Sequence, residues 1–235
     1  MGERVYAISA IALGIVGIVY HDFATVWQPV PDATPYRALL ACVFSSALLA
    51  GGILSFFERG RRVGLILVAA MYLVAALLWL PRVIGYPQIF GVWAGFAQEF
   101  VMVPAAMIAL RFHARIGVAL VGLCALVFGI EHFTAIPQTA HLVPAWMPLG
   151  QVFWAWATGV AFCLAGISFV GGLRVQLASQ LLAAMLVTFG LLVWLPPIFG
   201  HPTAHLVWAG NAINLAVAGS VLIVADWSAH DFSAN

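Results

Sequence analysis

Long, unbroken apolar runs are the feature of this sequence that most constrains its fold. A helix needs roughly 20 mostly apolar residues to cross the hydrocarbon core of a bilayer, and about eight such runs can be drawn along the 235 residues. Hydrophobic residues make up 64% of the chain and charged residues only 7%, far from the averages of soluble proteins. The composition therefore predicts an integral membrane protein.

The pattern inside these runs favours helices over strands. The runs are continuous, whereas the strands of a membrane β-barrel alternate apolar and polar residues. We therefore expect an all-α polytopic protein with spans at 5–20, 38–57, 63–80, 91–110, 116–130, 150–170, 177–195 and 204–224. The first run could also be a signal peptide, but it begins an internal repeat, which favours a span.

Charge and cysteine usage argue against several other functions. The net charge is close to zero, and there is no basic run or glycine-rich phosphate loop, so we expect no nucleic-acid or nucleotide binding. Cys42, Cys124 and Cys163 are isolated inside apolar runs and form no CxxC pair, so they are interpreted as buried apolar residues. The only HxxxH spacing, His201 to His205, begins in a Gly-Pro loop, and no metal site is expected.

Arginine placement predicts the orientation in the membrane, because the chain contains no lysine. With eight spans, seven arginines fall on one side and only Arg37 and Arg82 on the other. Positive loops stay in the cytoplasm, so both termini are predicted to be cytoplasmic, in an inner membrane. The same assignment places five histidines at the outer ends of helices or in outer loops: His21, His132, His141, His201 and His205.

The chain contains an internal repeat. The first and fifth spans end alike, in His21-Asp22-Phe23 and Glu131-His132-Phe133. A closer match relates LLWLPRVIGYPQIFGVWAGFAQEF, from Leu77, to LVWLPPIFGHPTAHLVWAGNAIN, from Leu192. A spacing of about 110 to 115 residues holds four helices, and an even number gives both copies the same orientation. We expect two four-helix units, 1–112 and 113–235, as parallel bundles about a pseudo-two-fold axis.

Polar residues inside the fourth and eighth spans are candidates for function. Glu99 lies about halfway along its span, where a carboxylate costs several kcal/mol unless it is protonated, paired or hydrated. The repeat places Asn214 opposite Glu99 and Asn211 opposite Phe96. Proton relay or ligand binding would use such groups, and hydrogen bonding between helices is the alternative.

The histidine-acid pairs at the outer helix ends are open to two interpretations. Glu131 with His132, or His21 with Asp22, could transfer protons at an outer quinone site. The same residues could instead cap helices at the membrane surface. Trp146, in the loop that follows, is a candidate ligand-binding residue, although tryptophans at this level often only anchor a protein in the interface.

With these segments in view, the start of the second half resembles the DoxX-like family of small four-helix membrane proteins. The residues that carry the resemblance are Gly129, His132, Phe133, Pro137, Val143-Pro144, Trp146, Pro148 and Thr158-Gly159. The first half keeps His21, Phe23 and Val30-Pro31 but lacks the AWMP portion. The resemblance implies a four-helix bundle, here doubled, and a link to quinone-dependent redox enzymes, of which some family members are subunits or membrane partners.

These observations together predict an inner-membrane protein that binds a quinone or similar amphiphile near its outer face and supports a redox reaction. Glu99, Glu131 and His132 are the candidate proton-handling residues. His21, Asn211, Asn214 and Trp146 are the candidate ligand-binding residues. The expected partners are the lipid bilayer and a redox enzyme subunit. Two alternatives stay open: a non-catalytic scaffold or assembly subunit, and a small-molecule or lipid transporter with Glu99 as its coupling group.

Overall fold

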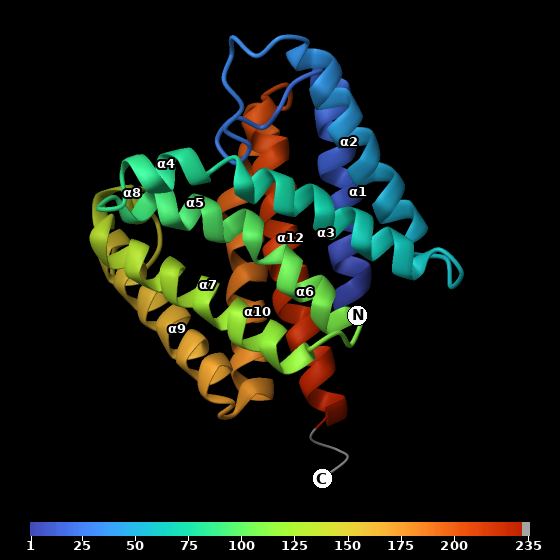
Figure 1. Cartoon of the computed structure of the whole chain (residues 1–235). Coiled ribbons are helices and arrows are strands. Elements are labelled where there is room, and N and C mark those ends of the chain that lie inside the picture. Colours follow the sequence, from blue (N-terminus) through green and yellow to red (C-terminus); the bar gives the residue numbers. More distant parts are fainter. Residues whose placement is uncertain (232–235) are drawn as a thin grey trace.

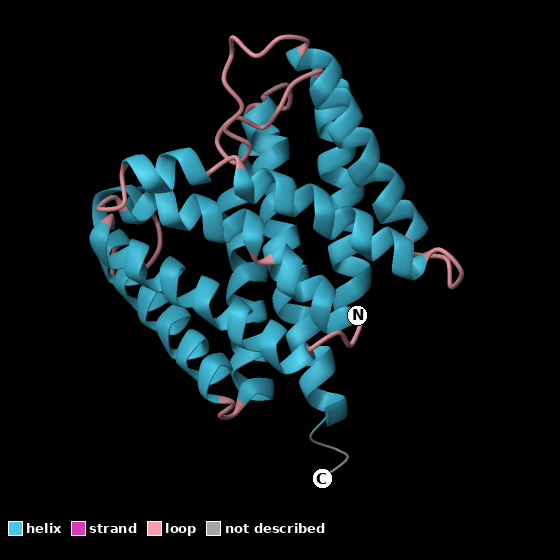
Figure 2. Ribbon diagram, in the orientation of Figure 1, coloured by secondary structure: helices cyan, strands magenta, loops and turns pink. Residues whose placement is uncertain are grey.

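The computed structural model describes residues 1–231 and consists, over that range, of helices joined by loops (Figure 2). In this part of the chain eight helices are long and apolar enough to cross a membrane. They are Gly2–Tyr20, Arg37–Leu54, Arg61–Gly85, Phe90–Ala109, Ala114–Thr134, Gln151–Gly171, Val175–Gly200 and His205–Ala229. The predicted all-α, polytopic architecture is therefore confirmed. The predicted orientation stays a prediction, and the C-terminus itself lies outside the described residues.

Three of the eight spans are interrupted, and a proline explains each interruption. Proline lacks an N–H and its ring clashes with the carbonyl four residues earlier. Pro81 accordingly follows the end of α3 (Arg61–Leu77) and lies in the short α4 (Leu80–Gly85). Pro104 lies four residues after the last residue of α5 (Phe90–Phe100), inside α6 (Met102–Ala109). The hydropathy pattern predicts a single helix for each of these spans, because it does not register the prolines.

The seventh span is interrupted by a wider turn. After α10 (Val175–Phe189) the chain forms the π-helical segment η1 (Gly190–Trp194) and then α11 (Pro196–Gly200). The amide of Leu195 donates to the carbonyl of Gly190, five residues back. Prolines 196 and 197 would clash with carbonyls inside η1 if the helix stayed regular, so the turn widens.

The remaining spans are unbroken helices: α1 (Gly2–Tyr20), α2 (Arg37–Leu54), α7 (Ala114–Thr134), α9 (Gln151–Gly171) and α12 (His205–Asp231). A short helix, α8 (Ile136–Leu142), follows α7 at the end that the arginines predict to be outside. Figure 1 shows α1 and α12 side by side, with the N-terminus near the last turns of α12.

The two halves interlock. Helix α1 packs against α2 and α12, while α7 packs against α9 and against α5 and α6. The first helix of each half therefore packs on the last span of the other half. The contact between α1 and α12 is close: a Cβ at Gly2 would lie 2.4 Å from the backbone nitrogen of Ile223. The division into units 1–112 and 113–235 stays a prediction, but neither unit buries its helices alone.

The same tryptophan-glycine contact occurs once in each half. A Cβ at Gly95 would lie 2.4 Å from the ring of Trp79, and one at Gly210 would lie 2.2 Å from the ring of Trp194. Because each glycine has no side chain, an indole from the interrupted third or seventh span rests directly on the next helix. The two glycine-tryptophan pairs occupy matching positions in the aligned repeats.

Candidate functional site

A cavity of about 310 Å³ lies where α7, α8, α9, α10 and η1 meet. It is at the end of the bundle that is predicted to be outside. Most of its lining is apolar, and the polar members are one histidine, three threonines and the indole nitrogens of two tryptophans. The lining side chains are His132, Thr139, Leu142, Val143, Pro144, Met147, Trp154, Thr158, Met185, Thr188, Phe189, Leu192, Val193 and Trp194.

His132 is held in one orientation by its own helix. Its Nδ1 lies 2.7 Å from the carbonyl oxygen of Phe128, and since a carbonyl only accepts, Nδ1 carries the hydrogen. The ring also lies 5.2 Å from the ring of Phe162. Nε2 then has no partner among the described residues. In the neutral ring it is an acceptor, and in the protonated ring it is a second donor.

The threonine hydroxyls of the cavity donate to their own helices. Thr158 donates to the carbonyl of Trp154 at 2.7 Å, and Thr188 donates to Ala184 at 2.9 Å. Thr139 does the same one turn back, to Ala135 at 3.1 Å. Each hydroxyl therefore offers only lone pairs to anything in the cavity.

The two tryptophans of the cavity differ in their indole nitrogens. Trp154 Nε1 donates to the carbonyl of Pro148 at 2.7 Å, whereas Trp194 Nε1 has no partner within residues 1–231. Among the lining residues, His132 and Trp194 thus have the two ring nitrogens for which the described part of the chain supplies no partner. One comes from the end of α7 and the other from η1.

The cavity brings together only part of the predicted outer site. Glu131 is half-buried and does not line it. Trp146 is 71% exposed, although its neighbours Pro144 and Met147 do line the cavity. His21 lies in the first half, where its Nδ1 is 3.4 Å from the sulfur of Cys42. Among the predicted outer residues, the structure places His132 alone at this cavity.

Glu99 lies in a different place, in the core between α1, α3 and α5. Its side chain is fully buried, and neither carboxyl oxygen has a hydrogen-bond partner in the described part of the chain. Tyr72, on α3, is close enough to interact electrostatically with this carboxyl, and its own buried hydroxyl lies beside Ser9. Glu99 is therefore a polar group buried without a partner among residues 1–231, which is energetically costly.

The asparagines of the eighth span face another surface. Asn211 and Asn214 line an apolar groove of about 500 Å³ between α1, η1 and α12. Asn211 Nδ2 donates to the carbonyls of Trp194 at 2.6 Å and Val207 at 2.9 Å. Asn214 Nδ2 donates to Leu186 at 3.2 Å, not to Glu99. The two asparagines therefore satisfy carbonyls near the interrupted seventh span.

Sequence reasoning missed most of the cavity. Trp154, Met185 and Thr188 line it, and none of them was among the predicted site residues. One signal was available: Thr158 belongs to the DoxX-like pattern and lies on the helix that packs closest to α7. Within residues 1–231 no three His, Cys, Asp or Glu side chains form a cluster that could hold a metal ion.

The fold and the cavity define a class: a polytopic membrane protein with eight candidate spans and a mostly apolar cavity at one end. No protein-family model, no curated protein and no solved structure matches the chain. The resemblance to the DoxX-like family therefore stays a prediction from the residues quoted above.

Proposed function

We propose that this protein binds a quinone-type amphiphile in the cavity beside His132 and thereby supports a redox reaction at the membrane. The observation that carries the proposal is the cavity itself, with its apolar walls and its two free ring nitrogens. Small-molecule sites are typically apolar hollows of about 300 to 1,000 Å³ with a few placed polar groups. This cavity is at the lower end of that range, so it suits a single ring headgroup whose apolar chain lies outside.

The polar groups suit a ring that carries two oxygens. Neutral His132 can accept a hydrogen bond from a quinol hydroxyl at Nε2, and protonated His132 can donate one to a quinone carbonyl. Trp194 Nε1 can donate only, so it suits the second oxygen in either redox state. A histidine that changes between acceptor and donor is what a reaction that moves protons with electrons requires.

The transporter alternative finds less support in the geometry. Transport would require polar groups that continue from the cavity through the bundle, and Glu99 was the expected coupling residue. Glu99 is fully buried between other helices and does not line the cavity. The scaffold alternative requires no cavity at all, so ligand binding separates it from our proposal.

Binding can be measured with a short-chain ubiquinone that carries one isoprene unit, because quinones quench the fluorescence of nearby tryptophans and two line this cavity. We expect saturable quenching in the purified protein. His132→Ala removes one hydrogen bond and should weaken binding by about tenfold. Thr158→Phe should fill the cavity and abolish saturable quenching.

His141→Ala is the matched control, because His141 lies in the same segment but is exposed and outside the cavity lining. It should bind as the unmodified protein does. Equal affinity in His132→Ala and His141→Ala, or quenching that survives Thr158→Phe, would place the ligand elsewhere. If binding holds but quinone-linked electron transfer in membranes is the same with Thr158→Phe, the redox role fails and the binding role stands.

A further inference from the structure

A second cavity, of about 410 Å³, lies at the opposite end of the bundle, where α1, α3, α6 and α12 meet. Its lining is rich in charged groups. They are the N-terminal amine of Met1, Glu3, Arg4, Arg61, Arg111 and Asp226, with the indole of Trp227 beside them. The proposed quinone site does not use any of these residues.

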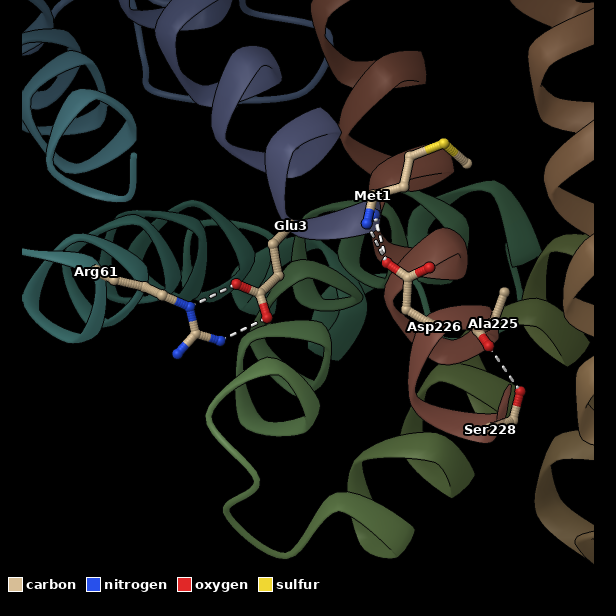
Figure 3. Close-up of polar contacts among 7 residues, drawn as sticks. Met1, Glu3, Arg61, Ala225, Asp226 and Ser228 are labelled. Atoms are coloured by element: carbon tan, nitrogen blue, oxygen red, sulfur yellow. Dashed lines mark hydrogen bonds and ion pairs between the residues drawn. The ribbon is translucent and has the colours of Figure 1, made fainter. Parts of the chain in front are cut away.

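Both acids of this cavity already have partners (Figure 3). Arg61 makes a two-point contact with Glu3, Nε to Oε2 at 2.7 Å and Nη2 to Oε1 at 2.5 Å. The same Nη2 donates to the carbonyl of Ala109 at the end of α6. Asp226 accepts from the amine of Met1 at 2.6 Å and from the amide of Gly2 at 2.7 Å. Neither carboxylate is left to neutralise another arginine.

Arg4 and Arg111 are the unpaired cations of the cavity. Both are exposed, and neither guanidinium group makes a hydrogen bond or ion pair within residues 1–231. Arg4 comes from the first turn of α1, whereas Arg111 lies in the turn between α6 and α7 with a left-handed backbone, φ 54°. With Arg61 and the amine, the described lining has four positive groups against two negative ones.

We propose that this cavity binds a phosphate group carried by an anionic ligand, such as a phospholipid headgroup. The guanidinium groups supply planar forks of N–H donors that match phosphate oxygens. The cavity lies at the ends of the spans, on the side that the arginines predict to be cytoplasmic, and basic pockets between helices on that side are typical sites for anionic lipids. Trp227 is suited to the same level, because indoles settle in the interface.

The position of Arg61 supports a built site over a diffuse basic surface. Glu3 and the Ala109 carbonyl fix its guanidinium before any ligand arrives, so little side-chain freedom is lost on binding. Arg4 and Arg111 then provide the charge that the acids do not cancel. The site predicts selectivity for a negatively charged phosphodiester over a zwitterionic one.

The test uses the full-length protein in nanodiscs that contain phosphatidylcholine with a small fraction of phosphatidylglycerol. We expect phosphatidylglycerol to be retained through purification, as measured by mass spectrometry of bound lipid. Arg4→Gln with Arg111→Gln should lower this retention by about tenfold or more. Neither arginine has a partner, so the double variant should fold and melt as the unmodified protein does.

Arg59→Gln with Arg174→Gln is the charge-matched control, because both arginines are exposed on the same predicted side and lie outside the cavity. It should keep the lipid.

In a second arm, inorganic phosphate in lipid-free detergent should fail to raise the melting temperature if the natural ligand is a lipid. If phosphate does so in the unmodified protein but not in Arg4→Gln with Arg111→Gln, the anion site stands and its source is a soluble phosphate. Equal loss in both double variants, or no preference for phosphatidylglycerol, would overturn the proposal.

Discussion

The segments that follow α1 and α7 start with similar residues, around His21 and His132, but they pack in opposite ways. After α1, the loop turns inward and buries Phe23, Ala24, Trp27 and Gln28. After α7, the chain forms α8 and leaves a cavity of about 310 Å³ against α9 and α10. In the first half, side chains of the loop fill the space at the helix end. In the second half, the corresponding space stays open and is large enough for a ligand.

Trp27 is the main reason for the closed end. It is 4% exposed, lies 5.8 Å from the ring of Trp194, and its carbonyl accepts a hydrogen bond from Trp79 Nε1 at 2.8 Å. Its indole thus lies beside the second-half tryptophan that lines the open cavity. The comparison teaches that a repeated helix end does not imply a repeated site, because the loop that follows decides whether the space is filled.

The largest expected change in stability concerns Trp27, in the loop that fills the space after α1. Trp27→Ala should lower the free energy of unfolding by about 3 kcal/mol, because it removes a buried indole and leaves a cavity. Thermal unfolding of the purified protein measures this change. Trp146→Ala is the control: that indole is 71% exposed, and its loss should change stability by less than about 0.5 kcal/mol. Similar melting temperatures for the two variants would mean that the loop does not stabilise the fold.

Arg37, the first residue of α2, holds the loop that follows α1 in place. Its Nε donates to Asp22 at 2.7 Å and its Nη1 donates to the carbonyl of Val30 at 2.5 Å. Arg37→Met should cost about 2 kcal/mol in chemical denaturation, because it removes two charge-assisted hydrogen bonds and leaves the carbonyl of Val30 without this donor. Arg82→Met, the control, removes the other arginine of that side, whose guanidinium lies 5.1 Å from the centre of the Trp79 ring. It should cost about 0.5 kcal/mol, and an equal loss in both would contradict the loop's dependence on Arg37.

The smallest expected changes in the free energy of unfolding concern Glu99 and Asn214, which occupy matching positions in the repeat. For Glu99 the expected change is a gain in stability. Glu99→Met should raise the free energy of unfolding by about 1 kcal/mol, because it replaces a buried acid without partners by an apolar chain of similar length. Asn214→Leu should lower it by about 0.5 kcal/mol, because it removes the bond to Leu186. The two melting temperatures should therefore shift in opposite directions. A lower melting temperature for Glu99→Met would show that the acid makes a stabilising bond.

A stabilised Glu99→Met variant would also bear on function. Natural sequences keep unfavourable buried groups mainly where activity requires them. If the variant is more stable and also retains quinone binding and redox activity, Glu99 takes no part in the proposed function. The core around Tyr72 would then be a separate feature of the first half.

Much of the architecture was predictable because hydropathy is a local property. Some 20 residues suffice to show that a segment crosses a bilayer, whatever its neighbours are. All eight spans, the absence of strands from residues 1–231 and the matching positions of Trp79 and Trp194 follow from the residues in order. The helix interruptions are also foreshadowed by local sequence, since a proline follows the start of each interruption within six residues.

The candidate sites depend instead on which helix faces meet, and no local pattern states this. Glu131 and His132 are adjacent in the chain, yet one lines the cavity and the other does not, because adjacent residues point about 100° apart around a helix. Arg4, Arg61 and Arg111 are distant in the chain, yet they line one cavity because α12 packs against both α1 and α6, and α3 packs against α6. The sequence alone determined that this is a membrane protein, with eight candidate spans within residues 1–231. Only the tertiary packing decided where it leaves room for a ligand.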